Sequence, residues 1–160
     1  MPVAPSSAAE LRIPIVQGVD VISAQIKIRR FARDAGFDPR DQWRIAIAVS
    51  EAATNILKFG ERGEIIVRFV VTGDGDPFLE FVAHDEGQGF TSVEEALRDR
   101  FTEGVDLDRE LYPYRGRGLG LGLGAIARMM DVLEIGRGED QGAVVCARKW
   151  LRRSPSATRR

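Results

Sequence analysis

The sequence predicts an α+β protein, a two-layer α/β sandwich in which helices cover one face of a mixed, mostly antiparallel sheet. Three observations support this prediction. Two segments with helical periodicity follow a single short strand near the N-terminus. The later apolar runs are short and rich in β-branched residues, and turns rich in glycine and aspartate separate them in pairs, as in hairpins.

Composition limits the protein to one globular domain. The chain has 160 residues, is 44% hydrophobic and 29% charged, and carries a net charge of -1. A chain of this length buries a core without disulfides or metals. Because Cys146 is its single cysteine and His84 its single histidine, a disulfide scaffold and a Cys/His zinc site are excluded.

The expected organisation is a flexible N-terminus at 1–10, one domain at 11–151, and a basic flexible tail at 152–160. No apolar run approaches the roughly 18 residues of a membrane span, and no signal-peptide pattern begins the chain. We therefore expect a cytoplasmic protein that does not bind membranes. The near-neutral charge argues against a nucleic-acid binder.

The first two elements are a strand and a helix. Residues 11–15 alternate apolar with polar side chains and include a proline, which is typical of an edge strand. A helix is expected to open at Asp20 and to close at Gly36. Its apolar side is expected to carry Ile22, Ile26, Ile28 and Phe31.

A second helix is expected over residues 39–59. Asp38 and the proline after it form a typical helix start, and Gly60 is a typical stop. Apolar residues at helical spacing predict the core face of this helix. They are Ile45, Val49, Ala52 and Ile56.

The second half of the chain alternates strands, turns and short helices. The expected elements are strands at 64–72 and 78–84, helices at 91–99 and 119–130, and strands at 132–135 and 144–150. The segment 100–118 has no clear period and is rich in charged residues, tyrosine and glycine. We expect a long loop there that acts as a lid.

Three polar features are candidates for chemistry. In the second helix, Glu51, Asn55 and Lys58 project side by side, away from the core face. Asp85 leaves a strand into a turn with Gly87 and Gly89, where a carboxylate can accept a hydrogen bond from a buried ligand.

The third feature is a run in which every second residue is glycine, directly before a helix. Its glycines are Gly116, Gly118, Gly120, Gly122 and Gly124. Such a run exposes backbone N–H groups to phosphates at the positive end of a helix dipole. Each feature also has a plain structural interpretation: a solvated helix face, an Asp/Gly turn, and close helix packing.

Together the three features resemble the N, G1 and G2 boxes of the GHKL ATPase superfamily, which has the Bergerat (HATPase) nucleotide-binding fold. The stretches at 48–56, 95–99 and 118–131 are similar to anti-sigma-factor-type serine/threonine kinases, above all to the RsbT stressosome switch kinase group. The resemblance covers roughly residues 11–150.

The resemblance implies roles for these residues. Asn55 would ligate Mg²⁺ and Glu51 would be the general base toward a serine or threonine hydroxyl. Asp85 would accept from the adenine of ATP, beside Gly87 and Gly89. The remaining phosphate-binding and charge-neutralising residues would be Gly116, Gly118, Gly120, Gly122, Arg115, Arg117 and Lys58.

The expected function is an ATP- and Mg²⁺-dependent protein serine/threonine kinase acting on a STAS-domain antagonist or scaffold protein. It would act in bacterial stress or sigma-factor partner switching. The alternative is a nucleotide-gated protein with little kinase activity that binds a sigma factor or activates a PP2C-type phosphatase. The detached ATP domain of a histidine kinase fits less well, because His84 lies beside the expected adenine pocket.

Overall fold

The protein is represented by a computed structural model that describes residues 9–86, 112–113, 122–138 and 142–152. Its elements follow one another as a strand, two helices, two strands, a short strand, a helix and a final pair of strands. They are β1 (Glu10–Ile15), α1 (Gly18–Asp34), α2 (Pro39–Phe59), β2 (Gly63–Val70), β3 (Phe78–Asp85), β4 (Tyr112–Pro113), α4 (Leu123–Met129), β5 (Val132–Arg137) and β6 (Ala143–Trp150).

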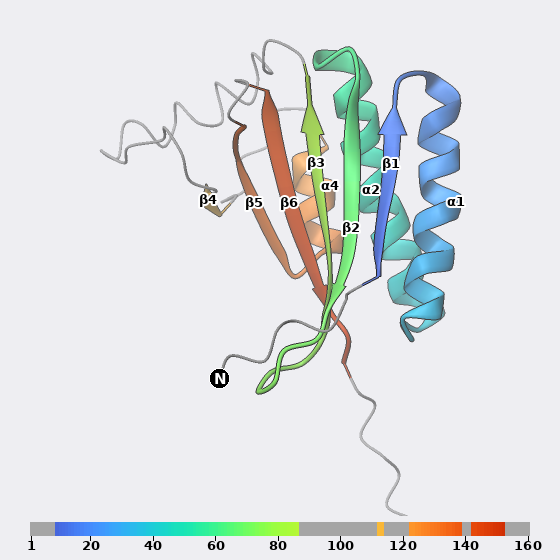
Figure 1. The fold of residues 1–160 in the computed structure, drawn as a ribbon, viewed down its shortest axis with the longest axis vertical. Coiled ribbons are helices and arrows are strands. Elements are labelled where there is room, and N and C mark those ends of the chain that lie inside the picture. The colour runs from blue at the N-terminus through green and yellow to red at the C-terminus, as the bar shows by residue number, and fades with distance from the viewer. Residues whose placement is uncertain (1–8, 87–111, 114–121, 139–141, 153–160) are drawn as a thin grey trace, which may run out of the picture.

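The strands form one sheet in the order β1-β2-β3-β6-β5-β4. Each pairing among these described strands is antiparallel, which is simpler than the expected mixed sheet. Helices α2 and α4 lie behind the sheet and α1 lies beside β1, packed on α2, so the helices form one layer against the sheet (Figure 1). The α+β two-layer sandwich is therefore confirmed.

The core lies between the helix layer and the sheet. Apolar side chains from the three helices and from the strands are buried there, which is the main stabilising contribution in a domain of this size. The largest of them include Phe81, Ile13, Ile28, Ile56, Ile65 and Ile126.

Helix α2 forms as the sequence predicts. The Asp38 side chain accepts a hydrogen bond from the backbone N–H of Asp41 at 2.8 Å, Pro39 takes the first turn, and Gly60 is the C-cap. A side-chain N-cap of this kind stabilises a helix by about 1 kcal/mol. The predicted core face is confirmed, since all four of its residues are buried: Ile45, Val49, Ala52 and Ile56.

Helix α1 starts earlier than expected, and its inward face is different. Asp20 lies in the first turn and accepts from the backbone N–H groups of Val16 and Gln17, both at 2.9 Å. Ile22 and Ile26, expected on the core side, are 59% and 66% exposed. The expectation was wrong for these two residues, whereas Ile28 is buried and Phe31 packs against the core as expected.

The reason is the rotation of α1 about its axis. At about 100° per residue, the face that contains Ile28 also contains Ala24 and Ala32, one turn before and one turn after. These two small residues are buried, and they allow α1 to pack closely onto the rest of the domain. Ile26 lies on the opposite side of the helix from Ile28.

The remaining differences concern the second half of the chain. Tyr112 and Pro113, expected within a loop, pair with β5 as a two-residue edge strand, a position where proline is tolerated. Helix α4 begins at Leu123 rather than near 119. The expected helix at 91–99, the rest of the 100–118 segment and most of the two expected flexible ends lie outside the described residues. Within the expected flexible N-terminus, Glu10 is described and is the first residue of β1, where it pairs with Arg68. No helix among the residues that are described is long and apolar enough to cross a membrane.

Candidate active site

The polar stripe of α2 runs from the protein interior to its surface. Asn55 is buried, with 7% of its surface exposed, whereas Glu51 is half-buried and Lys58 is exposed. On an ordinary solvated helix face, the side-chain amide of an asparagine would be exposed and not buried. The stripe therefore faces another part of the protein at Asn55 and opens to solvent at the end of the helix.

The start of α4 lies directly against Glu51. Gly122, the N-cap of α4, has φ +69°, in the left-handed region that favours glycine. A Cβ placed on Gly122 would overlap carboxylate oxygen Oε2 of Glu51. The last described glycine of the predicted phosphate loop and the predicted base are therefore in contact.

Asp85 ends β3 and is fully buried. Its carboxylate oxygen Oδ2 accepts a hydrogen bond from the backbone N–H of Ala143 at 3.3 Å. Three glycines, Gly60, Gly63 and Gly142, bring their backbones so close that a Cβ on any of them would overlap Asp85 or the carbonyl just before it. A ligand that contacts this carboxylate must displace part of what covers it.

The turn after α2 and the end of β3 are held together at one end of the sandwich. The backbone N–H of Glu86 donates to the carbonyl of Arg62 at 3.0 Å, and their side chains form an ion pair at 2.8 Å. Both segments lie at the same end of the sandwich (Figure 1). At this end of the sandwich the C-cap of α2, Gly60, lies against Asp85, and Asn55 lies just over one turn earlier on the same helix.

Several predicted site residues lie outside the described part of the chain. They are Gly87, Gly89, Arg115, Gly116, Arg117, Gly118 and Gly120. Within the described ranges no group of three or more His, Cys, Asp or Glu side chains could hold a metal ion. The described candidates for oxygen ligands are the Asn55 amide and the separate carboxylates of Glu51 and Asp85.

Sequence reasoning missed the glycines around Asp85. Gly60 was interpreted only as a helix stop and Gly142 only as part of a hairpin turn. The pairing of Gly63 with Asp85 follows from the hairpin register and could have been found by counting. Nothing in the sequence indicates that Gly142 approaches Asp85, because this contact depends on the pairing of β6 with β3.

The arrangement suits phosphoryl chemistry on a nucleotide. A carboxylate buried against main chain discriminates among hydrogen-bond donors, because an unmatched partner there is costly. An amide oxygen is a hard ligand of the kind that Mg²⁺ prefers. Glu51 is a half-buried carboxylate on α2 that lies against Gly122, the N-cap of α4.

Comparison with known proteins agrees with this geometry. Residues 20–149 match the family model of the histidine kinase-like ATPase domain. The chain is 32% identical over 133 residues to the serine/threonine-protein kinase RsbT of Bacillus subtilis (strain 168), an alignment that covers 83% of this chain and 90% of that relative. The chain therefore belongs to the histidine kinase-like ATPase domain family, of the GHKL type, and within it to the serine/threonine-protein kinases that resemble RsbT.

Proposed function

We propose that this kinase uses ATP and Mg²⁺ to phosphorylate a serine or threonine of a STAS-domain antagonist or scaffold protein, in a cytoplasmic partner-switching pathway of a bacterium. The observation that carries the proposal is the contact of Glu51 with Gly122, with Asn55 buried one turn further along α2 and the C-cap of α2, Gly60, against the buried Asp85. The 32% identity to RsbT supports a protein substrate for this site.

Nucleotide recognition is assigned to the end of β3. The Asp85 carboxylate would accept from the exocyclic amino group of adenine, and the close glycine backbones around it leave no room for a larger base substituent. Gly87 and Gly89 would let the chain pass beside the base. This assignment requires the cover over Asp85 to open.

Metal and phosphate binding are assigned to α2 and the glycine run. Asn55 would supply an oxygen ligand to Mg²⁺, whose charge, when bound, offsets that of the phosphates. Gly116, Gly118, Gly120 and Gly122 would donate backbone N–H groups to the phosphates. Cations that would neutralise charge at the γ-phosphate are Lys58, Arg115 and Arg117.

Glu51 would act as the general base. Its carboxylate would take the proton of the substrate hydroxyl while the hydroxyl oxygen bonds to the γ-phosphorus and the bond from phosphorus to the β,γ-bridging oxygen breaks, which releases ADP. The contact with Gly122 holds the Glu51 carboxylate at the start of α4. This position is next to the predicted phosphate loop.

The test is transfer of labelled γ-phosphate to purified STAS-domain proteins from the same genome. We expect one of them to accept phosphate on serine or threonine, and Glu51→Gln to lower the rate at least about 100-fold with ATP affinity kept. The matched control is Glu64→Gln on β2, a carboxylate on the sheet face away from the helices.

Two outcomes would contradict the proposal. If no STAS-domain protein is phosphorylated although the chain binds ATP and a partner, the protein acts as a nucleotide-gated binding protein and not as a kinase of such substrates. If Glu51→Gln transfers phosphate as fast as the Glu64→Gln control, Glu51 is not the base.

A further inference from the structure

The outer surface of α1 and α2 exposes an apolar stripe that no described element covers. On α1 the stripe contains Val19, Ile22 and Ile26, each more than half exposed and spaced by three or four residues. On α2 it continues with Trp43 and Ile47, one turn apart. Exposed apolar side chains gathered in this way mark interaction sites more often than single exposed residues do.

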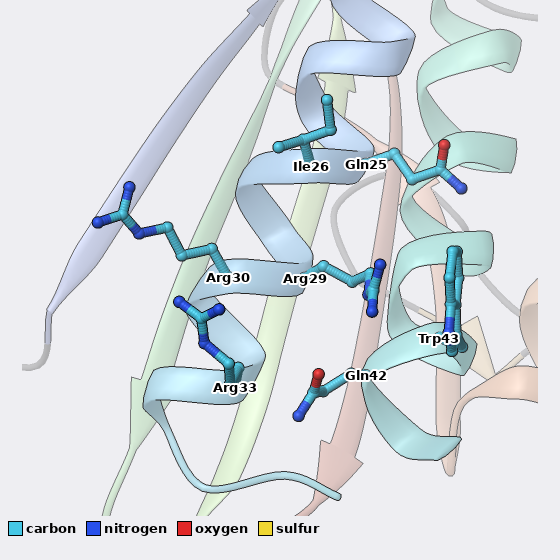
Figure 2. A pocket seen from close by; sticks show the side chains of 7 residues that line it. All are labelled: Gln25, Ile26, Arg29, Arg30, Arg33, Gln42 and Trp43. Carbon is cyan, nitrogen blue, oxygen red and sulfur yellow. The ribbon is translucent and has the colours of Figure 1, made fainter. Parts of the chain in front are cut away.

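Between the two helices this surface is hollow. A pocket of about 480 Å³ lies there, and Figure 2 shows Arg29 reaching from α1 toward Trp43 of α2. The Arg29 guanidinium lies 3.9 Å from the centre of the Trp43 ring. Gln42 closes the floor, where its Nε2 donates to the carbonyl of Phe37 at 2.7 Å. We call the surface formed by Ile22, Ile26, Arg29, Arg33 and Trp43 the α1–α2 groove.

The α1–α2 groove is cationic at one end. Arg29, Arg30 and Arg33 all line the pocket. Arg33 has Asp34 at 3.4 Å, a long contact between two exposed side chains, whereas Arg29 and Arg30 have no carboxylate within ion-pair distance in the described part of the chain. The uncompensated charge favours an acidic ligand.

We propose that the α1–α2 groove docks an acidic amphipathic helix of a partner protein. Apolar side chains of that helix would cover Ile22, Ile26 and Trp43, and its carboxylates would pair with Arg29 and Arg33. The stripe from Val19 to Arg33 is roughly 21 Å long at 1.5 Å per residue, about the length of four helical turns.

Two other occupants fit the observations less well. A bilayer surface is broad and would not fill a pocket between two helices that Arg29 and Trp43 line. A second copy of this chain would bring the same arginines to the contact and no acidic stripe to match them. Charge complementarity therefore selects an acidic protein segment.

The groove is separate from the candidate active site but lies on the same helix. Trp43 precedes Glu51 by eight residues, or roughly 12 Å along α2. No residue of the groove belongs to the proposed nucleotide site. Docking here therefore goes beyond the proposed function and does not depend on phosphoryl transfer.

The test uses the full chain and a designed probe. The probe is a peptide of about four helical turns with leucine at every third or fourth position and glutamate beside the leucine stripe. Two counterparts replace glutamate by lysine or scramble the order. In a Trp150→Phe background, Trp43 is the single tryptophan, so its fluorescence reports binding at the groove.

We expect saturable binding of the acidic peptide and at least about tenfold weaker binding of both counterparts. Ile26→Asp and the double variant Arg29→Ser/Arg33→Ser should each weaken binding at least about tenfold. The matched controls are Val71→Asp, at an equally exposed apolar residue, and Arg12→Ser/Arg68→Ser on the open sheet face. They should leave binding unchanged.

Three results would overturn the inference: equal binding of the acidic and scrambled peptides, equal effects of groove and control variants, or no binding of the acidic peptide. Two further measurements test the other occupants. Dimerisation abolished by Ile26→Asp in sedimentation would make the groove an interface between copies. Binding to vesicles that contain phosphatidylglycerol, abolished by the same variant, would make it a membrane surface.

Discussion

Gly122→Ala tests the contact between the start of α4 and Glu51. Gly122 has φ +69°, so an alanine there adopts a strained backbone, which costs about 1 kcal/mol. Its Cβ would also overlap the Glu51 carboxylate, which is the flexible end of a side chain and can move away. Moving it to a poorer rotamer adds about 1 kcal/mol. The expected loss of unfolding free energy is about 1–2 kcal/mol.

The larger expected effect is on phosphate transfer. A displacement of about 1 Å in a reacting group can cost roughly 100-fold in rate. Because the new Cβ occupies the place of Glu51 Oε2, we expect Gly122→Ala to lower the transfer rate by about this factor while the protein stays folded. Urea unfolding and single-turnover transfer to the protein that accepts phosphate in the proposed assay measure the two effects separately.

Gly36→Ala is the matched control. Gly36 also has a positive φ, of +100°, but the nearest atom to an added Cβ is Leu151 Cδ2 at 3.8 Å, which is ordinary contact. This variant should lose a similar unfolding free energy and keep the wild-type transfer rate. The reasoning is refuted if Gly122→Ala transfers phosphate at the wild-type rate, or if Gly36→Ala loses as much activity.

The remaining predictions concern buried or hydrogen-bonded side chains. Asp85→Asn should weaken ATP binding by about 1–3 kcal/mol in calorimetry and GTP binding little, and equal losses would contradict adenine recognition. Lys149→Met should lower the urea unfolding free energy by about 2 kcal/mol, because the buried ammonium donates to the Met129 carbonyl at 2.9 Å and lies near two carboxylates. Burial, and secondly a nearby glutamate, raise the pKa of Cys146 to about 12, so Ellman's reagent should react with it at pH 8 only after unfolding. Backbone N–H donors lower the pKa of Asp20, so its stabilising effect is present above its unfolded pKa and is lost as the pH falls through the folded pKa. The stability difference between wild type and Asp20→Asn should therefore be largest above about pH 4 and disappear in stronger acid.

Local signals were sufficient where one segment determines its own structure. Helix α2 carries its cap, its stop and its apolar period within its own residues, and its predicted bounds and core face are confirmed. The strand pairs β2–β3 and β5–β6 were likewise predicted from alternation and intervening turns. In each of these elements, residues close together in the sequence are sufficient to predict the local structure.

Prediction failed where distant segments decide the outcome. The inward face of α1 is chosen by packing, which prefers the small Ala24 and Ala32 to the larger Ile22 and Ile26. Hydrophobicity alone favours the isoleucines, so periodicity selected the wrong side. The exposed isoleucines are the residues on which the proposed docking groove depends. The failed prediction therefore coincides with a candidate functional surface.

Gly122 is part of both the proposed phosphate-binding run and the proposed site of proton abstraction. It is a member of the alternating glycine run, and as the N-cap of α4 it lies in contact with Glu51. A phosphate held by that run would therefore act on the backbone that positions the carboxylate. An added Cβ at Gly122 would overlap Glu51 Oε2, so the native carboxylate lies directly against this backbone. If both assignments hold, the proposed base lies against the segment proposed to bind the group to be transferred, which would couple nucleotide binding to activation of the hydroxyl.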